Sequence, residues 1–396
     1  MNGPSNEWSV KTLRRRVLYV QYTNPAAYPP LEHSSRLLAR DRWDVLFVGT
    51  GALGADALEF PPHERIRVWR VPFCPPGFRQ KAHYVLFAVR ALTFALLWRP
   101  QWVYASDLLS CPIALLLSFL PGIRVVYHEH DSPVEMSGGP FVRLCLLSRK
   151  WVAHRARLCV LPNDRRVERF SRQTGRKGSI FCARNCPTRE EVTGPRPSLN
   201  GGGLRVLYHG SIVPSRLPPA VLTALRALPP EVRLRIVGYE TTGYPGYTRQ
   251  IRALATDLGI HDRVEVIGPL PTRRELLERC RECQVGITLL SKGSVDPNEQ
   301  WMTGASNKPF DYLASGLALL VSDLPDWRAT YVDPGYGLAC DPDAPESIAA
   351  ALRWFLEHPN ETREMGERGR QRVMVEWNYE SEFAPVLDRM NADGRR

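Results

Sequence analysis

Short apolar runs alternate with longer amphipathic stretches along the first half of the chain. The apolar runs carry few polar residues, as strands buried on both faces do. They predict strands at residues 17–21, 44–48, 65–71, 102–105, 123–127, 158–161 and 180–183. The stretches between them predict helices at 31–40, 79–98, 113–120 and 141–155. Strands that are separated by helices pair in parallel, so we expect a parallel sheet with helices on both faces.

The second half repeats this pattern after a change in composition. Residues 188–203 contain Pro195, Pro197 and three consecutive glycines and lack apolar periodicity, which indicates a linker. Further strands are predicted at 205–208, 234–237, 264–267, 285–290 and 318–321, and helices at 216–228, 247–258, 272–283, 307–315, 344–358 and 360–376. The predicted division is an N-terminal domain 1–190, a linker 191–203, a second domain 204–376 and a last segment 377–396 that is expected to return to the first domain.

Two such halves predict an α/β fold of two Rossmann-like domains that face a central cleft. Ligands of these sheets bind beyond the carboxyl ends of the strands, so polar residues that directly follow a strand are candidate site residues. No G-x-G-x-x-G follows the first strand, and no G-x-x-x-x-G-K-[ST] is present. These absences argue against a nicotinamide dehydrogenase and against a P-loop enzyme.

The charge of the chain adds a class of partner. Its 396 residues include 52 Lys or Arg and 41 Asp or Glu, which gives a net charge of +11. A diffuse excess of this kind favours an anionic partner, such as a nucleotide, an acidic glycan or a membrane surface. A nucleic-acid partner is not expected, because no RNA-binding signature and no zinc-finger spacing is present.

The nine cysteines and the apolar stretches indicate the compartment. Residues 1–14 lack the apolar core of a signal peptide, so reduced thiols in the cytoplasm are expected. Two cysteine pairs, Cys182 with Cys186 and Cys280 with Cys283, lack a second half at zinc-ligand spacing, and no metal site is predicted. Residues 83–98 are too few to span a membrane, which favours a buried or interfacial helix and allows peripheral membrane contact.

The stretch 305–323, ASNKPFDYLASGLALLVSD, is the strongest candidate for ligand binding. A loop of small residues opens a short helix there, and the free amides of a helix start favour a phosphate oxygen. Lys308 adds positive charge, and the Asp311 carboxylate one turn later could accept hydrogen bonds from ribose hydroxyls. The residues alone leave a plainer alternative open, in which Asn307 caps the helix and Lys308 is solvated.

This stretch resembles the donor-binding segment of the retaining GT-B glycosyltransferases of group 1, also called family 4. The family pattern is N-K-x-F-E-Y-x-A-x-G-x-P-V-V-x-S-D. It is matched by Asn307, Lys308, Phe310, Asp311 in place of Glu, Tyr312, Ala314, Gly316, Ser322 and Asp323. Segments at 209–216, 236–238, 266–270 and 275–286 resemble other family motifs in order and spacing, with Gln284 where Asp is usual. The resemblance covers residues 200–390 well and the first half loosely.

The resemblance implies a nucleotide-diphosphate-sugar as co-substrate, with no cofactor and no metal. Arg216 would meet the diphosphate, supported by Lys308 or the loop amides, and Asp311 would hold the ribose. The remaining donor-binding positions that it implies are Gly210, Ser211, Gly238, Pro269, Leu270, Thr303, Gly304 and Asn307. Thr303 stands where the family has the first Glu of an E-x7-E pair, and Glu299 and Asp296 are alternative substitutes.

In the first half, the segment VVYHEHDSP resembles the family segment V-Y-D-x-H-E. His130 falls on the family's His near the donor sugar, and Asp131 on the Glu position. A solvated loop, or a helix cap by Asp131, is the alternative. The loop 22–30 corresponds to the acceptor loop, with Asn24 and Tyr28 as candidates beside an alternative of plain loop packing. Asp107 is a similar candidate after the fourth strand.

The reaction that the resemblance implies is glycosyl transfer with retention of anomeric configuration. The expected acceptor is a glycan or lipid-linked molecule in cell-surface polysaccharide assembly, in the cytoplasm or at the inner face of the membrane. Two alternatives remain at this point: a GT-B sugar-nucleotide epimerase, and a catalytically weak nucleotide-binding subunit with a degraded site.

Overall fold

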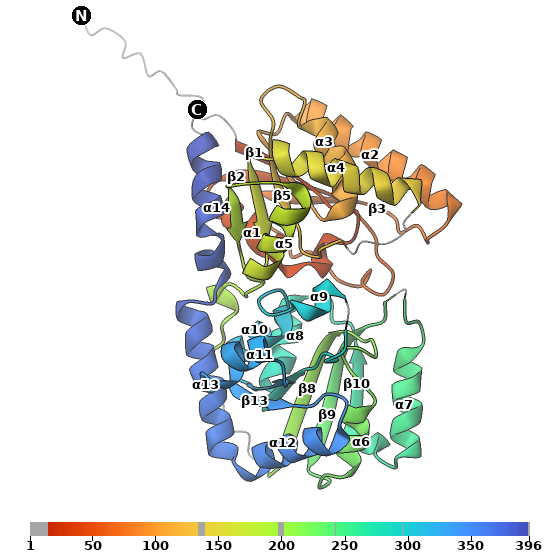
Figure 1. Ribbon diagram of the computed structural model, residues 1–396, viewed down its shortest axis with the longest axis vertical. Helices are drawn as coiled ribbons and strands as arrows, with labels where there is room; N and C mark the ends of the chain where they lie inside the picture. Colours follow the sequence, from red (N-terminus) through yellow and green to blue (C-terminus); the bar gives the residue numbers. More distant parts are fainter. Residues whose placement is uncertain (1–14, 134–138, 197–201, 242, 295, 395–396) are drawn as a thin grey trace, which may run out of the picture.

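The computed structural model describes residues 15–133, 139–196, 202–241, 243–294 and 296–394. Two parallel sheets, each with helices on both faces, lie one above the other in Figure 1. The predicted α/β fold with two Rossmann-like sheets is confirmed.

The first sheet has seven strands in the order β3-β2-β1-β4-β5-β6-β7. Its strands are β1 (Arg15–Val20), β2 (Trp43–Thr50), β3 (Ile66–Val71), β4 (Trp102–Ser106), β5 (Arg124–His128), β6 (Leu158–Leu161) and β7 (Ile180–Cys182). Its helices are η1 (Pro25–Ala27), α1 (Pro29–Arg40), α2 (Phe78–Trp98), η2 (Leu108–Ser110), α3 (Cys111–Leu117), α4 (Pro140–Arg155) and α5 (Asp164–Thr174). Side chains of β1 alternate between two cores: Leu18 and Val20 pack with α2, α3 and α4, and Val17 and Tyr19 pack with α1.

The second sheet has six strands in the order β10-β9-β8-β11-β12-β13. Its strands are β8 (Leu204–Ser211), β9 (Val232–Tyr239), β10 (Val264–Gly268), β11 (Val285–Thr288), β12 (Ala318–Ser322) and β13 (Gly337–Cys340). Its helices are α6 (Ala220–Arg226), α7 (Tyr247–Asp257), η4 (His261–Arg263), α8 (Arg273–Arg281), α9 (Pro297–Gln300), α10 (Asn307–Ala314), α11 (Pro325–Trp327), η5 (Arg328–Val332), α12 (Pro345–Glu357) and α13 (Pro359–Val375). The short helix η3 (Arg189–Glu191) belongs to the connection between the sheets.

The last helix, α14 (Tyr379–Gly394), leaves the second sheet and packs on the first. Tyr379, Phe383, Val386 and Met390 recur at helical spacing and lie fully buried in the core that also holds β1 and α1. The Trp43 indole donates a hydrogen bond of 2.9 Å to the side chain of Asn391. The chain therefore crosses between the two sheets twice.

Three elements illustrate where the structure differs from the sequence prediction. Strand β13 was not predicted, because its four residues follow Pro334 and Gly335 and offer only a short apolar run. The helix predicted at 216–228 is confined to α6, which starts after two prolines. The loop 22–30 contains η1 and the first residues of α1.

All nine cysteines lie in the described part of the chain and are free thiols, and seven of them are buried. Cys280 and Cys283 are fully buried in the core around α10. Among the described residues, no group of three or more His, Cys, Asp or Glu side chains is arranged to hold a metal ion.

Candidate functional site

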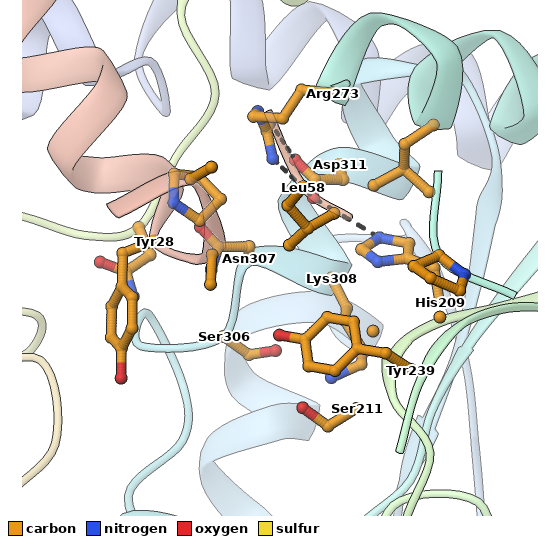
Figure 2. A pocket seen from close by; sticks show the side chains of 18 of the residues that line it. Tyr28, Leu58, His209, Ser211, Tyr239, Arg273, Ser306, Asn307, Lys308 and Asp311 are labelled. Atoms are coloured by element: carbon orange, nitrogen blue, oxygen red, sulfur yellow. Dashed lines mark hydrogen bonds and ion pairs between the residues drawn. The ribbon is translucent and has the colours of Figure 1, made fainter. Parts of the chain in front are cut away.

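A cavity of about 280 Å³ lies between the carboxyl ends of the two sheets. Its lining joins loops from both domains, as Figure 2 shows for Tyr28 of the first domain and Lys308 of the second. The predicted site residues that line it are Tyr28, His130, Asp131, Gly210, Ser211, Arg216, Gly238, Pro269, Leu270, Asn307, Lys308 and Asp311. Most of the site residues predicted from the sequence therefore lie around one cavity.

Two glycines at the carboxyl ends of β8 and β9 line one side of this cavity. Gly210 pairs with Gly238 in the parallel register, and both have positive φ angles, of 106° and 156°. A Cβ on Gly238 would lie 1.9 Å from the Gly210 carbonyl oxygen, and one on Gly210 would lie 3.0 Å from the Lys308 Cε atom. Side chains are therefore excluded here, which leaves backbone and the lysine facing the cavity.

Lys308 lies in the first turn of α10, and its side chain is buried at 9% exposure. Burial and the nearby Arg216 lower the pKa of Lys308 to about 7, against an opposing effect of Asp311. Ser306 is the N-cap residue of α10, and its side chain makes no capping hydrogen bond. The alternative in which Asn307 caps the helix and Lys308 is solvated is therefore wrong. The wall combines two cationic side chains with an uncapped helix start, which favours a bound anion.

A carboxylate supports the loop that carries Arg216. Glu299 accepts hydrogen bonds from Ser215 Oγ at 2.8 Å and from Ser294 Oγ at 2.6 Å. Asp296 instead caps α9 by accepting from the backbone N–H of Asn298 at 2.8 Å. Of the acidic residues near the missing first Glu, Glu299 is thus the one that contacts the segment before Arg216.

Thr303 and Gly304, which were expected to bind the donor, are not among the residues that line the cavity. The Thr303 hydroxyl donates a hydrogen bond to the Asp326 carboxylate. The Gly304 carbonyl accepts from the backbone N–H of Asn185 at 2.8 Å, and a Cβ on Gly304 would lie 3.0 Å from the Pro162 carbonyl oxygen. The absence of a side chain at Gly304 therefore allows close contact between the two domains, and not the close approach of a ligand.

Asn24, predicted on the acceptor side, has a supporting position. Its amide donates to the carbonyls of Ala55 at 2.8 Å and Leu58 at 3.1 Å, and its oxygen accepts from the backbone N–H of Ala26 at 3.1 Å. The side chain is buried and caps η1. Asn24 therefore fixes the loop that presents Tyr28 to the cavity.

Asp311 is part of a buried chain of charges that crosses the linker. Its carboxylate accepts a hydrogen bond of 2.8 Å from Arg273, and Arg273 also donates to Glu191 at 2.6 Å. The second carboxylate oxygen of Glu191 lies 2.8 Å from Nε2 of His33 on α1. Burial raises the pKa of Asp311, and Arg273, which lies beside it in Figure 2, opposes that shift. Burial alone would raise the pKa of Glu191, but Arg273 and His33 hold this pKa well below its usual value.

Arg273 and Glu191 were not among the predicted site residues. Arg273 follows a strand by several residues, and Glu191 lies in a segment that reads as a solvated linker. One local signal was available: the Thr188-x-x-Glu191 pattern of a capping box, which the structure contains.

His130 faces the cavity from the first domain. Burial and the nearby Arg166 lower its pKa to about 3, so the imidazole is neutral at physiological pH. Within the described part of the chain, neither buried ring nitrogen has a hydrogen-bond partner. The Tyr28 ring lies 5.4 Å from the His130 ring, centroid to centroid. The site thus holds a neutral imidazole that is available to a ligand.

Asp107 shapes the loop after β5. Its carboxylate accepts from the backbone N–H groups of His130 at 2.8 Å and Asp131 at 3.3 Å. Burial and the charge of Asp131 raise the pKa of Asp107 to about 7. His128, by contrast, is fully buried and hydrogen-bonded to Tyr104 at 2.7 Å. Asp107 is therefore a positioning residue, and its place directly after β4 is the signal that marks it.

Two family models match the two halves of the chain. The family described as "Glycosyl transferases group 1" matches residues 195–372, and the family "Glycosyl transferase 4-like domain" matches residues 31–186. No curated protein matches the chain by sequence.

Solved structures match the chain over nearly its full length. The sucrose-phosphate synthase of Thermosynechococcus elongatus is 16% identical with a TM-score of 0.69, over 96% of this chain and 98% of that one. Anabaena HepE in complex with UDP-glucose is 15% identical with a TM-score of 0.69, over 95% and 99%. WaaG, a glycosyltransferase involved in lipopolysaccharide biosynthesis, is 15% identical with a TM-score of 0.63, over 94% and 99%. At these identities the likeness concerns the fold.

Proposed function

Because the chain belongs to the group 1 glycosyltransferases of the GT-B fold, we propose that it transfers a sugar from a nucleotide-diphosphate-sugar to an acceptor hydroxyl, with retention of anomeric configuration. The observation that carries this proposal is the convergence of Lys308, Arg216 and the uncapped first turn of α10 on one wall of the cavity. A diphosphate suits this wall, since it offers several oxygens to a guanidinium, an ammonium and backbone amides at once.

In the proposed step, the bond between the anomeric carbon and the β-phosphate oxygen breaks as the acceptor oxygen bonds to the same carbon. The acceptor proton passes to an oxygen of the leaving diphosphate on the same face of the sugar. The products are the glycoside and the nucleoside diphosphate. The protein stabilises the charge that grows on the diphosphate through Arg216, Lys308 and the helix-start amides, and no metal ion takes part.

The first domain holds the reacting sugar and the acceptor in this proposal. The neutral imidazole of His130 can exchange hydrogen bonds with sugar hydroxyls without adding a charge near the anomeric carbon. Tyr28 and Asp131 line the same side and contact the acceptor. Asp311 accepts hydrogen bonds from the ribose, since a carboxylate oxygen has a lone pair to spare beyond its bond to Arg273.

The acceptor is a glycan or a lipid-linked molecule of cell-surface polysaccharide assembly, used at the cytoplasmic face of the membrane. The excess of basic residues supports an acceptor carried at an anionic surface.

Thermal stabilisation by UDP, GDP, ADP, CDP and dTDP and their sugar conjugates tests the donor site. A ligand at 100 times its Kd adds about 2.7 kcal/mol to the stability of the protein that binds it. Losing a charge-assisted hydrogen bond weakens binding by roughly 10–100-fold. For Arg216→Ala the added stability is then expected to fall to about 0.4–1.4 kcal/mol at the same ligand concentration. Arg226→Ala, on the exposed end of α6, is the matched control and is expected to keep the full shift.

Product analysis separates the proposed reaction from its alternatives. The anomeric configuration of the product, read by NMR from the preferred donor and a panel of glycan and lipid acceptors, is expected to match that of the donor. Activity is expected to survive EDTA. Interconversion of the donor sugar without an acceptor would identify an epimerase instead. Absence of any thermal shift in a folded sample would refute the donor site.

A further inference from the structure

Exposed apolar side chains gather on three neighbouring helices of the first domain. Of the fifteen large hydrophobic residues that the described chain exposes, eleven lie between residues 78 and 151. They include Leu86 and Leu97 of α2, at 48% and 78% exposure, and Leu147 and Trp151 of α4, at 60% and 61%. We call the exposed side of α2, α3 and α4 the α2–α4 face. Large apolar side chains that are exposed together on neighbouring helices indicate an interaction site.

The helix α2 is apolar on both of its sides. Tyr84, Phe87, Ala91 and Ala95 recur at helical spacing and bury one side in the core of the first domain. The opposite side would be polar in a helix that faces water, but here it carries six of these eleven exposed hydrophobic residues. Within the described residues, α2 is also the one helix long and apolar enough to cross a membrane. Its buried stripe holds it flat along the sheet, so an apolar partner meets it from the side.

The charge pattern of the α2–α4 face indicates the chemistry of that partner. None of the three helices contains an Asp or Glu residue. Arg79, Lys81 and Arg90 of α2 and Arg143 and Lys150 of α4 are exposed among the apolar side chains. Apolar side chains interleaved with cations fit the interface of an anionic bilayer. A second copy of the chain fits poorly, because pairing this face with itself would oppose like charges.

The α2–α4 face also ends beside the cleft. Helices α2, α3 and α4 follow strands β3, β4 and β5, whose carboxyl ends point toward the cavity, so the helices begin on the cavity side (Figure 1). The Tyr22 hydroxyl lies 2.7 Å from Nδ1 of His83, which connects the start of α2 to the loop that presents Tyr28. A molecule held in the bilayer would therefore be close to the acceptor side of the cavity.

We propose that the α2–α4 face docks the protein on an anionic lipid bilayer, with α2 lying in the plane of the interface and the mouth of the cleft at the membrane surface. The docking proposal depends only on the exposed residues of the α2–α4 face. The delivery of a lipid-linked acceptor to the cavity depends in addition on the proposed function.

Co-sedimentation with vesicles tests the charged component of docking. The protein is expected to bind vesicles of phosphatidylcholine with phosphatidylglycerol more tightly than phosphatidylcholine alone, and less as salt increases. At roughly fivefold per basic residue near the surface, Lys81→Ser with Arg90→Ser should weaken binding by about 25-fold. Arg226→Ser with Arg233→Ser, two exposed arginines of the second domain, is the matched control and should bind as the unmodified protein does.

The apolar component has its own pair of variants. Leu86→Ser with Leu97→Ser is expected to weaken vesicle binding by about tenfold or more. Met374→Ser with Val375→Ser removes exposed apolar side chains from α13 and should have no effect. Thermal stabilisation by the preferred nucleotide is expected to be unchanged in all four variants, which shows that they fold and keeps failure of docking distinct from failure of the donor site.

Three results would overturn the proposal. The first is absence of binding to either vesicle, or equal binding by the α2–α4 variants and their controls. The second is a dimer in sedimentation velocity that Leu86→Ser with Leu97→Ser dissociates while vesicles stay unbound, since the face would then join two copies. The third is binding that withstands both high salt and alkaline carbonate, because α2 would then be inserted across the bilayer.

Discussion

The buried ammonium group of Lys308 destabilises the folded protein. In the unfolded chain a lysine has a pKa near 10.4, whereas burial and Arg216 lower the pKa of Lys308 to about 7. Between these two values the unfolded state binds the extra proton, so the penalty on folding is largest at low pH and declines as pH rises. At about 1.36 kcal/mol per pKa unit, it amounts to about 4 kcal/mol at pH 7 and about 2 kcal/mol at pH 9.

Replacing this lysine by methionine, which has a similar shape and no charge, should remove the penalty. Lys308→Met is therefore expected to raise the melting temperature of the unliganded protein at pH 7 by about 10 °C, at ~2–4 °C per kcal/mol for a domain of this size. At pH 9 the gain should be about half as large. Differential scanning fluorimetry at both pH values measures it. Lys292→Met is the control, because Lys292 is an exposed lysine paired with Asp341 at 2.9 Å.

In the unmodified protein, a bound diphosphate should make the protonated form of Lys308 favourable. The phosphate charge favours protonated Lys308, so nucleotide affinity is expected to fall with rising pH above about 7, by up to tenfold per pH unit. Lys308→Met should lose most nucleotide stabilisation and this pH dependence together. The reasoning is refuted if Lys308→Met melts at or below the unmodified protein at pH 7, or if the difference is the same at pH 9.

Two further predictions concern the other groups of the cavity. His130→Phe is expected to lower kcat by roughly 10–100-fold with little change in the KM of the donor, whereas a large rise in KM alone would assign His130 to binding. Initial rates of the unmodified enzyme should show no titration of His130 between pH 5 and 9, because its pKa is about 3. Arg273→Met is expected to destabilise the protein by about 3–5 kcal/mol in urea unfolding, since Asp311 and Glu191 lose a buried partner. Combining Arg273→Met with Asp311→Asn should cost less than the sum of the two single changes, and strict additivity would contradict the coupling.

The central strands of this fold, such as β4 and β12, were predictable because they are buried on both faces. The run at 102–105 consists almost entirely of apolar residues, which indicates a buried strand, and β4 is indeed buried throughout. The same reasoning fails for β13, which lies at the edge of the described sheet beside β12 and carries Gly337 where a side chain would meet the Leu319 carbonyl oxygen. Short edge strands depend on a neighbour that the local sequence does not contain.

The candidate site was predictable where residues directly follow strands. His130 follows β5, Gly210 and Gly238 lie at the carboxyl ends of β8 and β9, and all three line the cavity. Thr303 and Gly304 were placed by the spacing of a family pattern instead, and contacts from residues more than 100 positions earlier, such as Asn185, draw that segment toward the first domain. Long-range contacts of this kind leave no periodic trace in the sequence.

The two walls of the cavity differ in charge, and a chain of buried ionic contacts connects the domains that form them. The second domain supplies the cations, whereas the first supplies the neutral His130. In the buried chain His33–Glu191–Arg273–Asp311, the strong guanidinium–carboxylate contacts lie within the linker and the second domain. Among the described residues, the His33–Glu191 contact is the one that joins this chain of charges to the first domain. Separation of the two domains would therefore break the His33–Glu191 contact and leave Asp311 fixed by Arg273.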